Sequence, residues 1–252
     1  MEKRIASPAI REDHRARELI SFLEQSTDEI GLIEPIIYYD YPLFRDENNR
    51  SYRPRLILVS RSHGVVLFSL DSDTQQSDSF LSQVDSIIYA KLLKSPILRK
   101  GKRELSVDIH SVIFSTDLPA NGNYEDLDSS VVTSFGGLKH VLAEWRAATI
   151  PDDQWKELIA HIDGGKGIIR PKERKIEKLP TTSKGAVLNQ LEGEIANFDR
   201  DQRLAAISLV DGPQRIRGLA GSGMTIVLAM KAANIHLQNP QARILFKFWT
   251  KS

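Results

Sequence analysis

The spacing of apolar residues predicts helices in the first part of the chain. Apolar side chains recur every three or four positions along residues 16–32, 79–94 and 137–147, which is the period of an amphipathic helix. Pro96 follows the second of these segments and marks its end, because proline does not continue a helix. We therefore predict three helices, each with one apolar face directed at a core.

Continuous apolar runs predict strands between these helices. Residues 54–60 (PRLILVS) and 64–70 (GVVLFSL) are rich in β-branched residues, and the turn at residues 61–63 between them is typical of a β-hairpin. Residues 33–41 and 107–115 also have an extended pattern. Runs of this kind suit strands that are buried on both faces. The order of helix, hairpin, helix and strand predicts a mixed α/β domain.

The pattern changes after the leading domain, which we place at residues 1–163. Residues 164–184 are rich in Gly, Pro, Lys and Arg and have no sustained apolar period, so we interpret residues 164–190 as a basic linker. A solvated tether is the simpler interpretation, and a strip of contacts to DNA phosphates is the alternative. Beyond the linker we predict a helix over residues 225–237 and a strand over residues 242–249.

Composition limits the classes of protein that the chain can belong to. Its 252 residues are 41% hydrophobic, which indicates a folded chain, and the formal net charge of +1 selects no class of partner. There is no cysteine, so disulfides and thiolate zinc sites are excluded. No apolar run reaches the roughly 18 residues of a membrane span. We expect a cytoplasmic protein without a membrane partner.

A glycine-rich stretch at residues 217–225, RGLAGSGMT, has the spacing of a phosphate-binding loop. Glycines let backbone N–H groups approach phosphate oxygens, and the N-terminus of the following helix adds partial positive charge. A hydroxyl at the end of the loop would be a ligand of Mg²⁺. The candidate nucleotide-binding residues are Gly218, Gly221, Ser222, Gly223 and Thr225, and Thr225 is also the candidate magnesium ligand.

Met224 stands at the catalytic position where such a loop has a lysine that pairs with the β- and γ-phosphates. Methionine is similarly long and flexible but has neither a charge nor a donor. Without the lysine contact, the transition state loses stabilisation on the order of several kcal/mol. We therefore expect deficient ATP hydrolysis. A deliberate replacement of lysine and a naturally decayed site both remain open.

From Gly218 to Ser252 the sequence closely resembles the first ATP-binding segment of UvrD-like superfamily 1 DNA helicases, which reads approximately GxAGSGKT, a helix, and a strand ending in TFxT. The resemblance implies that residues 191–252 begin a RecA-like domain, with ATP and Mg²⁺ as cofactors and DNA, expected to be single-stranded, as partner. Gln202 in FDRDQRLAAI matches the glutamine that reads adenine in the family's Q motif. Thr250 matches a position that contacts DNA, although Lys247 stands where the family has threonine.

The same resemblance implies elements that do not follow in this sequence. A helicase uses Walker B acids, an arginine finger and a second RecA-like lobe to hold magnesium and close on the nucleotide. We therefore expect this chain, as the amino-terminal portion of a helicase or translocase, not to hydrolyse ATP or unwind DNA alone. A sheet truncated in this way exposes its edges, so we expect residues 226–249 to pack on the leading domain, swap between chains or rearrange.

The leading domain resembles the nuclease-related domains of the PD-(D/E)xK type that precede some superfamily 1 helicases. In those domains an aspartate on one strand and an acid followed by lysine on the next hold a metal and activate water. Here Arg55 and residues 69–71 (SLD) occupy the corresponding places, so the acid pair is missing. Glu34, Asp40 and Asp71 remain as scattered carboxylates that could form a metal cluster. We expect a nuclease-like fold without the chemistry; an active nuclease and a DNA- or protein-binding module are the alternatives.

The histidines offer no better site, because none of them stands at metal-ligand spacing from another. We interpret His63 as the tip of the hairpin. His110 alternates with apolar neighbours in a strand, and we expect it to be partly exposed with satisfied hydrogen bonds.

Overall fold

The computed structural model of the chain describes residues 1–41, 44–45, 50–101, 103–163, 205, 215–216, 224–238, 241 and 243–245. The chain divides into two units, Met1–Arg170 and Pro171–Ser252. Each unit is described by itself below. The predicted linker, residues 164–190, lies outside the described residues.

The first unit is a mixed α/β domain, as the sequence predicts. Its strands are β1 (Glu2–Ile5), β2 (Ile36–Tyr39), β3 (Phe44–Arg45), β4 (Ser51–Tyr52), β5 (Leu56–Ser60), β6 (Gly64–Ser69), β7 (Ile109–Phe114) and β8 (Ser130–Val132). Its helices are α1 (His14–Gln25), α2 (Thr27–Ile30), α3 (Thr74–Leu92), α4 (Phe135–Glu144) and α5 (Asp152–Ile162), with short 3₁₀ helices η1 (Pro8–Arg11) and η2 (Pro96–Leu98).

Six of the strands form one sheet in the order β1-β2-β5-β6-β7-β8, and β3 pairs with β4 separately. The pairs β1/β2, β6/β7 and β7/β8 are parallel, while β2/β5 and β5/β6 are antiparallel. The predicted hairpin is confirmed, since Leu56 pairs with Phe68 and Ser60 with Gly64. Gly64 has a φ of 67°, and a Cβ there would lie 2.2 Å from the carbonyl oxygen of Asp108, so this turn requires glycine.

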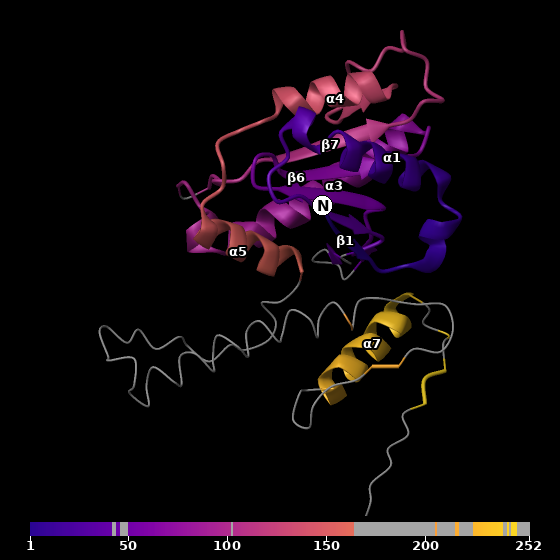
Figure 1. The fold of residues 1–252 in the computed structure, drawn as a ribbon, viewed down its shortest axis with the longest axis vertical. Helices are drawn as coiled ribbons and strands as arrows, with labels where there is room; N and C mark the ends of the chain where they lie inside the picture. The colour runs from indigo at the N-terminus through magenta and orange to yellow at the C-terminus, as the bar shows by residue number, and fades with distance from the viewer. Residues whose placement is uncertain are drawn as a thin grey trace, which may run out of the picture. The chain divides into compact units, whose positions relative to one another are not determined.

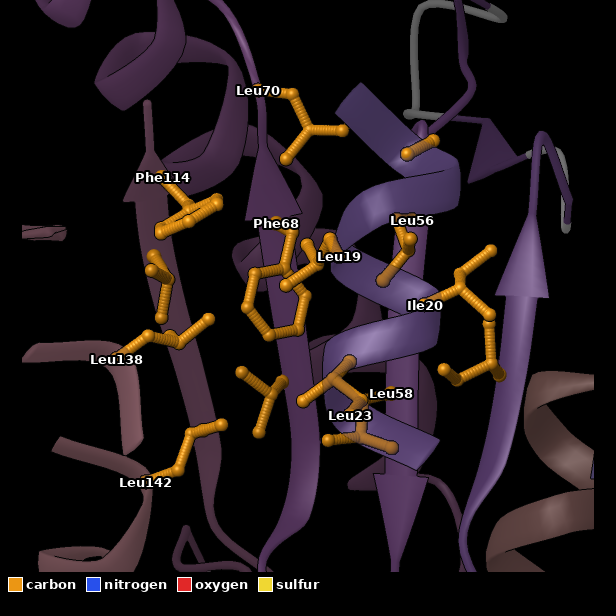
Figure 2. Close-up of a cluster of buried hydrophobic side chains, with 14 of the residues drawn as sticks. Leu19, Ile20, Leu23, Leu56, Leu58, Phe68, Leu70, Phe114, Leu138 and Leu142 are labelled. Atoms are coloured by element: carbon orange, nitrogen blue, oxygen red, sulfur yellow. The ribbon is translucent and has the colours of Figure 1, made fainter. Parts of the chain in front are cut away.

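Helices cover both faces of the sheet (Figure 1). On one face, Leu19 and Leu23 of α1 lie over Leu58 and Phe68, and α4 packs beside them (Figure 2). On the other face α3 and α5 pack against the alternate strand residues, such as Ile57. Successive strand residues point to opposite faces, so every position of β5 and β6 is buried. This two-sided burial explains the continuous apolar runs of the hairpin.

The sequence pattern missed four strands and a helix, and it joined two helices into one. β1 reads EKRI and has no apolar alternation; its Arg4 is buried because its guanidinium bonds to the Tyr38 hydroxyl at 2.9 Å and pairs with Asp163. β3, β4, β8 and α5 were not predicted either. The predicted helix at residues 16–32 is interrupted at Ser26, and Gly31 ends α2 with a left-handed φ of 76°.

The second unit contains helix α7 (Met224–Gln238), which confirms the helix predicted at residues 225–237. Residues 243–245 belong to the strand predicted at residues 242–249 but have no regular secondary structure, and the rest of that prediction lies outside the described residues. A search of the described part of the chain found no helix with the length and apolar character needed to cross a bilayer.

Candidate functional site

Two of the predicted site residues, Met224 and Thr225, lie in the first turn of α7 as the structure describes it. Met224 is the first residue of that helix and is half-buried, and Thr225 follows it with an exposed side chain. Val227, one turn into the helix, is buried. The remaining predicted residues lie outside the described part of the chain: Gln202, Gly218, Gly221, Ser222, Gly223 and the predicted DNA contact Thr250. The Thr225 hydroxyl is thus available to solvent, whereas Met224 offers no donor to an anion.

A hydrogen bond joins α7 to the segment of the predicted Q motif. The Lys231 ammonium donates to the carbonyl oxygen of Ala205 at 3.2 Å. Partial burial lowers the pKa of Lys231 from its usual value. Ala205 is three positions after Gln202 in the sequence, and Gln202 itself lies outside the described residues.

A second candidate region lies in the first unit, where β6 ends and α3 begins. A pocket of about 310 Å³ opens there, lined by Arg53, Arg55, Phe68, Ser69, Asp71, Gln76, Ser77 and Phe80. It includes the positions that the nuclease resemblance singled out, Arg55 and Asp71, and their side chains are bonded to each other at 3.3 Å. The pocket therefore holds an ion pair where a metal-dependent nuclease would hold acids and a lysine.

Asp13, immediately before α1, holds Arg55 of this ion pair by a second bond. Its side chain is 4% exposed and accepts three hydrogen bonds: from Arg55 Nε at 2.6 Å, the Tyr39 hydroxyl at 2.9 Å and the Ala16 amide at 3.1 Å. Burial acts to raise the pKa of Asp13, but the bonds from Arg55 and the helix backbone outweigh it and lower that pKa. Burial and the bond to Asp13 raise the pKa of Tyr39 to about 12.

These values describe a saturated ionic network rather than a reactive one. Asp13 is ionised and has its oxygens occupied, and Tyr39 stays protonated as its donor. Neither group is poised near neutral pH to exchange a proton with a substrate. The sequence analysis missed Asp13, although an aspartate just before an apolar helical period is a recognisable N-cap signal.

The metal cluster considered for the scattered carboxylates is not formed. Each carboxylate has its own arginine: Glu34 pairs with Arg61 at 3.0 Å, Asp40 with Arg53 at 3.6 Å, and Asp71 with Arg55. Among the described residues, no group of three or more His, Cys, Asp or Glu side chains is placed to hold a metal ion. Pairing with arginine, which stays charged at any relevant pH, explains why these acids do not converge on a common point.

His63 lies in the hairpin turn, as the sequence predicts, whereas His110 differs from its interpretation in its hydrogen bonding. The His63 side chain is buried, with Nδ1 2.8 Å from Ser62 Oγ and Nε2 2.9 Å from the Leu142 carbonyl oxygen. His110 is stacked on Trp145 with ring centroids 4.2 Å apart, and its Nε2 is buried without a hydrogen-bond partner among the described residues. Burial lowers the pKa of both imidazoles, so both are neutral at pH 7.

Comparisons with protein-family models, curated proteins and solved structures find no match to this chain.

Proposed function

We propose that this chain is part of an ATP-dependent DNA helicase or translocase and carries a phosphate-binding loop disabled by Met224. The RecA-like character of residues 191–252 and the nuclease-like character of the leading domain belong to this proposal. ATP and Mg²⁺ are the proposed cofactors, with Thr225 as magnesium ligand and Gln202 as adenine reader. DNA is the proposed partner.

The observation that carries the proposal is that a helix, α7, follows the glycine stretch. A phosphate-binding loop works because its last glycine delivers the chain directly into a helix, so that the helix N-terminus and loop amides face the phosphates. Residues 224–238, which follow the glycine stretch GLAGSG in the sequence, form α7. The bond from Lys231 to Ala205 adds support, because the family's Q motif works next to the phosphate loop.

Met224 limits what the site can do. The exposed Thr225 hydroxyl is a suitable oxygen ligand for Mg²⁺, but the thioether beside it supplies no cation for the β- and γ-phosphates. We therefore propose weak nucleotide binding and negligible hydrolysis for the chain as it stands.

A calorimetric titration with Mg²⁺ and ATP tests this proposal on the chain and on Met224→Lys in parallel. Binding gained in Met224→Lys, and lost again when Thr225→Ala is added, is the expected result. Circular dichroism of each variant establishes that α7 and the leading domain remain folded. Absence of binding in a folded Met224→Lys chain would refute a formed phosphate site.

A second proposal, that the leading domain is a binding module, is favoured by the network around Arg55. An active metal nuclease needs carboxylates free to bind the ion, whereas Asp13 and Asp71 are both bonded to Arg55. The domain is then a docking unit with a nuclease-like framework. Cleavage of plasmid DNA by the purified chain with Mg²⁺ or Mn²⁺, abolished by EDTA, would contradict this.

A further inference from the structure

An exposed cluster of cations lies on the loop between η2 and β7 in the first unit. We call Arg99, Lys100 and Arg103 the basic cluster; all three side chains are exposed. We propose that the basic cluster is a contact site for the phosphate backbone of double-stranded nucleic acid. It is separate from the nucleotide loop, and the inference does not depend on ATP binding.

The first argument is that these cations are unpaired. Five other arginines of the same unit form ion pairs with carboxylates: Arg4, Arg15, Arg53, Arg55 and Arg61. By contrast, within the part of the chain that the structure describes, no carboxylate pairs with Arg99, Lys100 or Arg103. Glu104 is adjacent and exposed, so the four residues together carry two net positive charges. Most basic residues on a surface are merely solvated, so a second observation is needed.

Backbone bonds hold the described residues of this loop on both sides of position 102. Arg99 forms an antiparallel bridge with Leu105, and the Lys100 amide donates to the Glu104 carbonyl oxygen at 2.9 Å. The Tyr89 hydroxyl of α3 donates to the Arg103 carbonyl oxygen at 2.7 Å.

Buried side chains fix both ends of the loop. Leu98 before it is fully buried and Val107 after it is 4% exposed, and both belong to the core between the sheet and α3. A solvated tether has no need of such anchoring. Cations presented on a fixed backbone lose less conformational entropy when they bind.

The neighbourhood of the cluster selects among polyanions. Proteins that hold single strands use exposed aromatic rings on which bases stack. Near the cluster, the Tyr89 ring is exposed, but its hydroxyl donates to the Arg103 carbonyl oxygen, and the exposed Ile97 offers no ring. Among the described residues near the cluster, the surface supplies three cations and one ring whose hydroxyl is bonded to the loop, and a surface dominated by charge fits the closely spaced phosphates of a duplex.

Lys94 is not part of the basic cluster, because the end of α3 accounts for a cation at this position. It lies just past the end of α3, where the partial negative charge of the helix C-terminus stabilises a cation. The basic cluster has no such local reason.

The test measures binding of the full chain to a short fluorescein-labelled DNA duplex by anisotropy, without nucleotide, over a series of salt concentrations. The triple variant Arg99→Gln/Lys100→Gln/Arg103→Gln removes the cluster. A matched control, Lys3→Gln/Arg17→Gln/Lys156→Gln, removes three exposed cations elsewhere on the unit with the same change in net charge. We expect the cluster variant to bind the duplex roughly tenfold more weakly, or more weakly still, at low salt. The magnitude of its slope of log affinity against log salt should fall by about 2.7. The control should keep both values near those of the original chain.

A footprint on the unaltered chain gives an answer that does not depend on the variants folding. Acetylation of Lys100 should be slowed by the duplex, while that of Lys156 should not. The proposal is overturned if the chain does not bind the duplex, if both triple variants lose the same affinity, or if Lys100 is not protected. Preference for a single strand, or capture by phosphatidylserine vesicles in place of DNA, would equally overturn it. Because ATP is absent throughout, failure here leaves the nucleotide-loop proposal untouched.

Discussion

Replacing Asp13 with alanine should destabilise the first unit more than the loss of an ordinary helix cap. Asp13 Oδ1 caps α1 by accepting from the Ala16 amide, and Oδ2 accepts from Tyr39 and Arg55. Removing a capping side chain costs about 0.5–2 kcal/mol. The Tyr39 hydroxyl, in a residue only 4% exposed, would lose its acceptor, which adds about 1–3 kcal/mol. Arg55 is 40% exposed and keeps Asp71, so water compensates most of its loss.

The chain offers a matched control in Asp73, which caps α3. Asp73 accepts from the Gln76 amide at 3.0 Å, and this bond is exposed. Asp73→Ala therefore removes a cap without stranding a buried partner, at about 1 kcal/mol. We expect Asp13→Ala to lose about 2–4 kcal/mol, so the difference between the two variants isolates the buried network.

The assay is urea unfolding followed by tryptophan fluorescence in a Trp249→Phe background, which leaves Trp145 and Trp155 of the first unit as reporters. An unchanged slope with denaturant in both variants means that only stability has changed. If Asp13→Ala lost no more than Asp73→Ala, the buried bonds from Tyr39 and Arg55 would carry no stability. The lowered pKa of Asp13 also predicts that its contribution is present above the unfolded pKa of about 3.9 and is lost as pH falls through the folded value.

Two further predictions concern the hairpin turn and its surroundings. Gly64→Ala should destabilise the unit by about 1–3 kcal/mol, because of the positive φ and the clash with Asp108. Gly136→Ala in α4 is the control: a side chain there meets nothing within 4 Å, so this variant should be neutral or more stable by up to about 1 kcal/mol. Similar urea midpoints for both variants would be inconsistent with this prediction. The lowered pKa values of His63 and His110 mean that the unfolded chain binds protons more readily, so stability should be complete above about pH 6.5 and decline as the pH falls towards the folded values. Urea unfolding across that range should show a shallower decline in His63→Gln, and an identical pH dependence would rule out His63 as a cause.

The elements that the sequence predicted are those whose pattern is set by burial alone. Residues 54–60 and 64–70 are apolar at consecutive positions because both faces of the sheet are covered, and the structure has a hairpin there. α3 and α7 likewise follow from one apolar period each. β1 was missed because Arg4 is buried through a partner at Asp163, and no local pattern records a pairing across the whole unit.

The candidate sites were predictable to the same limited extent. The glycine spacing is local, so the sequence could predict a loop followed by a helix; the structure confirms the helix, and the loop stays a prediction. The network of Asp13, Tyr39 and Arg55 was not predictable as a unit, because its members come from three elements that meet only in the folded sheet. In the sequence, Arg55 is a charged residue directly before a strand, with no evident partner. Its role follows only from its contact with the Asp13 carboxylate.

That network also bears on whether the leading domain could regain metal chemistry. Arg55→Asp would put a third carboxylate beside Asp13 and Asp71 but would remove the cation that lowers the pKa of Asp13 and bonds to both acids. Without a bound metal, the buried Asp13 would then face like charge, and desolvation would raise its pKa. This single substitution would thus produce repulsion among three carboxylates rather than a metal site. The arginine stabilises this end of the sheet through the same contacts that make the pocket unsuitable for a catalytic metal, which favours a domain that binds a partner over one that cleaves it.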